Sequence, residues 1–130
     1  MTSRHQLIEA WTAGWAHSRA TPAPQATPYG FELHVGLPGH LARHVLHSFD
    51  AAHILALTRR ITEPGVFLKV CAAADPLAEL LPAGWSVNAV NALMSTALAA
   101  TSRPVASPEG FEISLAPRVE RRTQPHRQGR

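Results

Sequence analysis

Cysteine is almost missing from this 130-residue chain, which contains Cys71 alone. One cysteine excludes an intrachain disulfide and a zinc site built on several cysteines. Cys71 lies in the apolar run VFLKVCA, which favours a buried and unreactive thiol. Long apolar runs are also missing, and the N-terminus MTSRHQLIEAW lacks the apolar core of a signal peptide. These absences predict a cytoplasmic protein without a membrane span.

Self-sufficient catalytic motifs are missing as well. The sequence has no G-x-S-x-G nucleophile elbow, no P-loop and no dinucleotide-binding fingerprint. Acidic residues are sparse, and Asp50 and Asp75 stand where helix caps are expected. Glu32 and Glu112 occupy outward positions of alternating segments, which is typical of a solvated strand face. No catalytic residue is therefore predicted from motifs.

Positive charge is concentrated at the C-terminus, in the stretch RVERRTQPHRQGR. Residues 118–130 hold five arginines and one glutamate, whereas residues 1–117 hold seven basic and eight acidic side chains. The formal net charge of +3 therefore comes from the tail and implies no basic face on the folded part. We expect residues 1–117 to form one domain and residues 118–130 to be a disordered tail. A nucleic-acid-binding arm is the alternative interpretation of the tail.

The N-terminal segment, residues 4–19, is predicted to be a helix. Ser3 and Gln6 have the spacing of a capping box. One side of this helix is apolar and carries Leu7, Ile8, Trp11 and Trp15. The three prolines and the glycine of residues 20–30 predict a connecting loop.

The remainder of the chain mixes short strands and short helices. GFELHVG alternates as a half-buried strand, GLPGH supplies a turn, and ARHVLHSF is expected to return as the partner strand. A helix after Asp50 ends at Pro64-Gly65, VFLKVCA is a strand, and DPLAELLP is a short helix capped by Asp75. A strand is predicted over residues 85–90 with a second extended piece over residues 93–98, and FEISLA, residues 111–116, is predicted as a further strand. The order α-β-β-α-β-α-β-β predicts an α+β fold, with helices packed on a mainly antiparallel sheet.

Three histidines, His40, His44 and His47, invite a metal interpretation. On a strand, the first two would share one face and His47 would point to the other, so no metal site is predicted. Four residues are candidates for a ligand pocket: Trp11, Trp15, Arg19 and Arg43. A tryptophan pair at this spacing is more typical of a helix anchored to a sheet, and ligand stacking is the alternative.

Several segments together resemble the N-terminal portion of certain bacterial proteins of the GNAT N-acetyltransferase superfamily. They are AWTAGWAHSR, TPAP, HVGLPGH, RHVL, RRITEPGVFLKV, LPAGWSV and LMSTAL, and the similarity covers roughly residues 7–116. In such proteins a degenerate N-terminal α/β unit precedes the catalytic domain. SPEGFEISLA is similar to the opening strand of that second domain.

The resemblance implies a limited role for this chain. The superfamily binds the pyrophosphate of acetyl-CoA with a Q/R-x-x-G-x-G/A turn at a helix N-terminus, and no such turn occurs here. We therefore expect a GNAT-related domain that is non-catalytic by itself, without a cofactor, and that supports an acetyltransferase domain or binds a small molecule. Two alternatives stay open: a divergent N-acetyltransferase that uses acetyl-CoA, and an interaction module whose basic tail engages nucleic acid.

Overall fold

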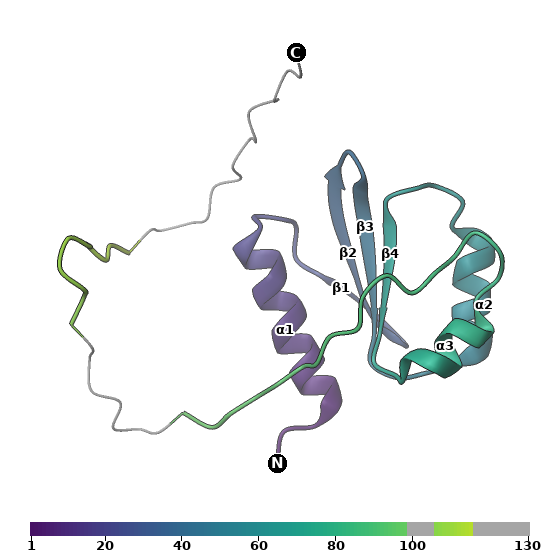
Figure 1. Cartoon of the computed structure of the whole chain (residues 1–130), viewed down its shortest axis with the longest axis horizontal. Helices are drawn as coiled ribbons and strands as arrows, with labels where there is room; N and C mark the ends of the chain where they lie inside the picture. The colour runs from purple at the N-terminus through teal and green to yellow at the C-terminus, as the bar shows by residue number, and fades with distance from the viewer. Residues whose placement is uncertain (99–105, 116–130) are drawn as a thin grey trace.

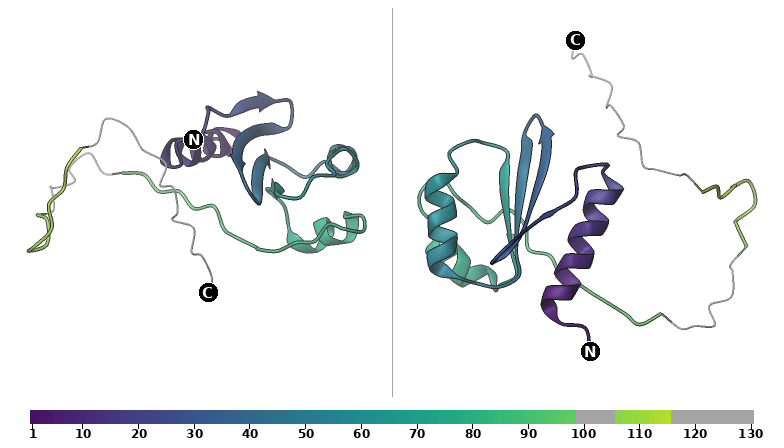
Figure 2. Two further views of the ribbon diagram at one scale, coloured as in Figure 1. Left: turned by 90° about the horizontal axis from the view of Figure 1, so that it is seen from above. Right: turned by 180° about the vertical axis from the view of Figure 1, so that it is seen from behind.

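The helices and strands of this chain form a three-layer unit around one four-stranded sheet. The computed structural model describes residues 1–98 and 106–115. Within them the elements are α1 (Arg4–Ser18), β1 (Gln25–Thr27), β2 (Gly30–Leu37), β3 (His40–Leu46), α2 (Ala51–Arg60), β4 (Val66–Val70) and α3 (Ala74–Leu80). Helix α1 covers one face of the sheet, and α2 and α3 lie on the other (Figures 1 and 2).

The sheet has the strand order β1-β2-β3-β4. The first three strands are antiparallel, and β4 runs parallel to β3 because α2 carries the chain across between them. The predicted α+β class with a mainly antiparallel sheet is confirmed. Among the described residues, no helix has the length and hydropathy that crossing a bilayer requires.

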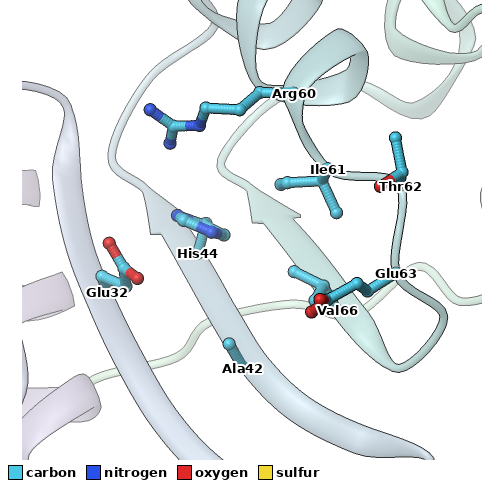
Figure 3. Close-up of a pocket in the computed structure, with 8 residues that line it drawn as sticks. All are labelled: Glu32, Ala42, His44, Arg60, Ile61, Thr62, Glu63 and Val66. Carbon is cyan, nitrogen blue, oxygen red and sulfur yellow. The ribbon is translucent and has the colours of Figure 1, made fainter.

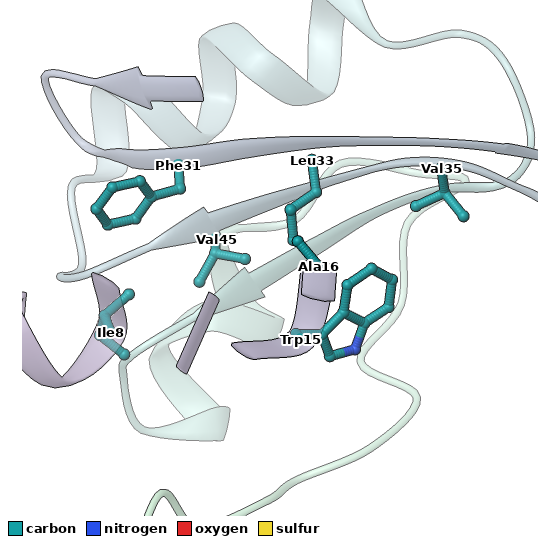
Figure 4. Packing of buried hydrophobic residues seen from close by; sticks show 7 residues of the cluster. All are labelled: Ile8, Trp15, Ala16, Phe31, Leu33, Val35 and Val45. Carbon is teal, nitrogen blue, oxygen red and sulfur yellow. The ribbon is translucent and has the colours of Figure 1, made fainter. Parts of the chain in front are cut away.

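Two apolar clusters hold the three layers together. The first joins α1 to β2 and β3, and contains Ile8, Trp15, Ala16, Phe31, Leu33, Val35 and Val45 (Figure 4). The second, under α2, is built on Leu46, Ile54 and Leu57, with half-buried aliphatic side chains from β4 and α3 around it. Each cluster uses alternate residues of the strands, because successive side chains point to opposite faces.

The predicted N-terminal helix and its cap are confirmed. The amide of Gln6 donates to the Ser3 hydroxyl over 3.2 Å, and the Gln6 side chain accepts from the Ser3 amide over 2.8 Å. Trp15 is 7% exposed, as a core anchor requires, and Trp11 is half-buried. Cys71 packs against the same cluster, and burial raises the pKa of its thiol.

The loop predicted over residues 20–30 is wrong in part, because it contains β1. This strand has three residues between Pro24 and Pro28, and it pairs with the start of β2 at the edge of the sheet. An edge position tolerates flanking prolines, since one side of the strand needs no hydrogen-bond donors.

The cap predicted for α3 is also wrong. The helix begins two residues earlier than expected, with Ala73 at the N-cap and no side-chain cap, so Asp75 lies inside the first turn. Pro76 is then the third residue of the helix, where its missing N–H costs nothing because the first four amides have no partner within a helix.

The strands predicted after α3 are not found in the described part of the chain. Residues 85–98 and 111–115 have no regular structure. Trp85 and Val87 are half-buried, but most of the other apolar side chains are exposed, among them Val90, Met94, Leu98, Phe111 and Ile113. Alternation alone does not make a strand, because a strand needs a neighbour to accept its backbone hydrogen bonds. The predicted disordered tail, residues 118–130, lies outside the described residues.

Candidate functional site

Two arginine side chains contact the Trp15 ring on the face of the sheet that α1 covers. The Trp15 indole packs among the core side chains (Figure 4). Little of the residue's surface remains exposed to solvent. Arg19, one helical turn after Trp15, holds its guanidinium carbon 4.3 Å from the ring centroid. Arg43 reaches the same ring from β3, with its guanidinium carbon 4.8 Å from the centroid.

Two more rings complete this group. The His40 ring lies 5.7 Å from the Trp15 ring and 5.1 Å from the Phe67 ring, both edge-on. Arg43 also lies 5.9 Å from the Phe67 centroid, and its Nη2 is 3.4 Å from His40 Nε2. We call these five residues, Trp15, Arg19, His40, Arg43 and Phe67, the Trp15 cluster.

The Trp15 cluster carries positive charge without a counter-charge. Within the described residues, neither guanidinium pairs with a carboxylate, and Arg43 Nε is buried without a hydrogen-bond partner. Burial lowers the pKa of Arg43, and the nearby charge of Arg19 lowers it further. The pKa of His40 is likewise lowered, by burial first and then by Arg43 and Arg19. A bound anion would offset the repulsion between these positive charges.

The four residues predicted as ligand-pocket candidates all lie on this face. Trp15, Arg19 and Arg43 meet in the Trp15 cluster, and Trp11 lies one turn earlier on α1. Lys69 Nζ, from β4, is 5.1 Å from the Trp11 ring centroid. The structure therefore brings the candidates together, and ligand binding by them stays a prediction.

The other face of the sheet carries an open cavity of about 560 Å³ (Figure 3). It lies beside the end of α2, over β2, β3 and the start of β4. Its lining consists of Glu32, Ala42, His44, Arg60, Ile61, Thr62, Glu63 and Val66. Two carboxylates, one guanidinium and one imidazole thus border one space, a combination that the sequence pattern did not indicate.

His44 is the most buried ionisable group of this cavity, with 8% of its surface exposed. Burial lowers the pKa of its ring, and Arg60 and His53 act in the same direction, while the Glu32 carboxylate opposes them. Glu32 is the cross-strand partner of His44 in the β2–β3 pairing. This partnership corrects the prediction that Glu32 lies on a plain solvated face. Pairing the two strands about the GLPGH turn was the signal that could have found it.

The predicted faces of the histidines are wrong. His40 turns toward Trp15 on the α1 face, whereas His44 borders the cavity on the other face. His40 is the first residue of β3 and lies where the β2–β3 pairing becomes irregular, between His34 and Leu37 of β2. His47 contacts the His5 ring at 5.1 Å. Across residues 1–98 and 106–115, no three His, Cys, Asp or Glu side chains are grouped as metal ligands would be.

The N-terminus of α2 is the place where a pyrophosphate-binding turn would be expected. It follows the carboxyl end of β3 in the parallel β3–α2–β4 crossover, a position where α/β units bind phosphates. Here the Asp50 carboxylate accepts a hydrogen bond from the His53 amide over 2.8 Å. The Tyr29 ring stacks on the His53 ring at 3.8 Å. A carboxylate that already caps the helix and repels an anion does not fit a pyrophosphate.

Comparisons of the chain with protein-family models, with curated proteins and with solved structures give no match.

Proposed function

We propose that this chain is a GNAT-related α+β domain that is non-catalytic by itself, and that it supports an acetyltransferase or binds a small molecule. The geometry favours the second of these roles, with the cavity around His44 as the binding site. The resemblance of its segments to N-terminal units of GNAT proteins supports the relationship.

The Asp50 cap is the observation that supports a non-catalytic role for this chain. A pyrophosphate at the start of α2 would need free amides and a positive local potential. The Asp50 side chain takes the His53 amide and adds a negative charge at that point. Acetyl-CoA therefore loses the contact that holds its most highly charged part.

The cavity lining indicates the kind of molecule that would bind. Glu32 and Glu63 offer carboxylates to an amine, and Arg60 offers a guanidinium to a carboxylate (Figure 3). A small molecule with both groups, such as a free amino acid, matches this mixture of charges. Ile61 and Val66 provide the apolar surface on which its side chain would rest.

Acetyl-CoA tests the non-catalytic part directly. Calorimetry is expected to show no saturable heat, and incubation with a panel of amines is expected to release no thiol above background. The Asp50→Asn variant tests the effect of the negative charge alone, because asparagine keeps the cap and removes the charge. Thiol release by the natural chain would contradict the proposal and favour a divergent N-acetyltransferase.

A panel of free amino acids tests the cavity. Ligand-observed NMR is expected to find members of the panel that bind the natural chain. The Ala42→Leu variant, which fills the cavity floor, should lose them, and Glu63→Gln should weaken them. Binding that is unchanged in Ala42→Leu would show that the cavity is not the site, whatever the acetyl-CoA result.

A further inference from the structure

The guanidinium groups of Arg19 and Arg43 both lie close to the Trp15 indole ring, although like charges repel each other. Both carbons lie within 5 Å of the Trp15 centroid, so they are at most about 9 Å apart. A tetrahedral oxyanion has several acceptor oxygens and can accept charge-assisted hydrogen bonds from two guanidiniums. Arg19 is exposed at the end of α1, so an anion in solution can reach its guanidinium, while Arg43 is half-buried.

Attraction to the ring does not account for the whole arrangement. One cation over an indole is attracted to the ring, but a second cation at the same ring adds repulsion between like charges. Arg43 is also partly removed from water, and its buried Nε donates to nothing within the described residues. Buried charges in proteins are normally paired. An anion beside Arg19 and Arg43 would supply this pairing.

We propose that the Trp15 cluster binds the phosphate group of a small phosphorylated molecule between Arg19 and Arg43. Two fixed positive charges match a phosphate monoester, which carries about −1.5 to −2 charges at neutral pH. A single carboxylate would leave one of the two guanidiniums uncompensated. Phe67 and Trp15 make up the apolar wall of the site, and the His40 ring stands beside Arg43.

This site is separate from the cavity of the proposed function. Arg43 and Glu32 lie on opposite faces of the sheet, since Arg43 pairs with Leu33 and His44 pairs with Glu32. The phosphate site can therefore be present whether or not the cavity binds an amino acid.

Inorganic phosphate is the probe that tests the proposal. The full chain, labelled with ¹⁵N, is titrated at constant ionic strength, and the Nε–Hε signals of Arg19 and Arg43 are followed together with the His40 ring. We expect saturable shifts at all three residues. The pKa of His40 should rise when phosphate is bound, because the anion offsets the two charges that lower it.

Variants and other anions give the controls. Arg19→Met alters an exposed side chain and should leave the fold intact while weakening phosphate binding about tenfold or more. Arg43→Lys keeps the charge and loses the planar fork, so it should also bind more weakly. Arg59→Met, an exposed change on α2, should bind as the natural chain does. Sulfate should bind like phosphate, and acetate much more weakly.

Three results would overturn the proposal. The first is a phosphate affinity that Arg19→Met leaves unchanged. The second is acetate binding as tight as phosphate binding, which would show that the site does not select a dianion. The third is a titration in which signals elsewhere move and those of Arg19, His40 and Arg43 do not.

Discussion

The two faces of the sheet differ in the charges that they gather. Under α1, the strands present Arg43, Phe67 and Lys69 next to two tryptophans. On the other face, which α2 covers, the sheet presents Glu32 and His44. Strand alternation sorts the side chains in this way, so one short sheet can carry a cationic site on one face and a mixed-charge cavity on the other.

The difference extends to how each face is stabilised. The α1 face depends on one large aromatic anchor, Trp15, inserted among β-branched and aromatic side chains. The α2 face depends on several aliphatic side chains of similar size around Ile54. A large anchor concentrates its contribution in one residue, whereas the aliphatic cluster divides it among many.

The largest effect is expected from the anchor. Trp15→Ala should lower the free energy of unfolding by about 3–5 kcal/mol, since it leaves a cavity under α1. Urea unfolding followed by circular dichroism measures this loss. Trp11→Ala is the matched control and should cost clearly less, because Trp11 is only half-buried. Equal costs for the two variants would show that Trp15 is not the anchor.

A moderate effect is expected at the start of α2, on the other face. Asp50→Ala removes the acceptor of the His53 amide and should cost about 1 kcal/mol, in the range 0.5–2. Asp50→Asn keeps the acceptor and should stay close to the natural chain in the same urea experiment. A loss in Asp50→Asn as large as that in Asp50→Ala would indicate that charge, and not capping, is what Asp50 provides.

A smaller, pH-dependent change in the free energy of unfolding is expected from His44 and His40, which lie on opposite faces of the sheet. Burial lowers the pKa of both rings below 6.5, so the unfolded chain binds protons at these positions more readily than the folded chain. The free energy of unfolding should therefore fall as the pH drops through about 6.5, and these rings contribute nothing well above that pH.

Urea unfolding at pH 7.5 and 5.5 measures the drop in stability. His44→Gln and His40→Gln should each reduce the drop. Saturating phosphate should reduce the contribution of His40 to this drop in stability and leave the contribution of His44 unchanged. A drop that neither variant changes would mean that other groups cause it.

Local signals predicted much of the fold from the sequence. The Ser3–Gln6 capping box and the Asp50 cap each involve residues three apart in the chain, so their geometry follows from helix formation alone. The Phe31–Val35 alternation predicted β2 for a similar reason. The strands expected over residues 85–98 failed because a strand also requires a partner, which local alternation does not reveal.

The sites were harder to predict because they depend on pairing across the sheet. Trp15 and Arg19 are one helical turn apart, which the sequence shows, but the approach of Arg43 requires the packing of α1 on β3. Glu32 and His44 meet only through the β2–β3 register. The sequence pattern therefore identified Trp15, Arg19 and Arg43 as candidates, but it placed His40 on the wrong face and did not single out Phe67. It also missed the cavity.

The central claim is that anions are bound on the α1 face and not at the start of α2. Inorganic pyrophosphate, titrated into ¹⁵N-labelled protein, tests this claim in one measurement, because both regions report in the same spectrum. We predict saturable shifts of the Arg19 and Arg43 side-chain signals, with the amides of His53 and Ile54 unmoved. Shifts of those two amides, with the Arg19 and Arg43 signals unchanged, would contradict the account.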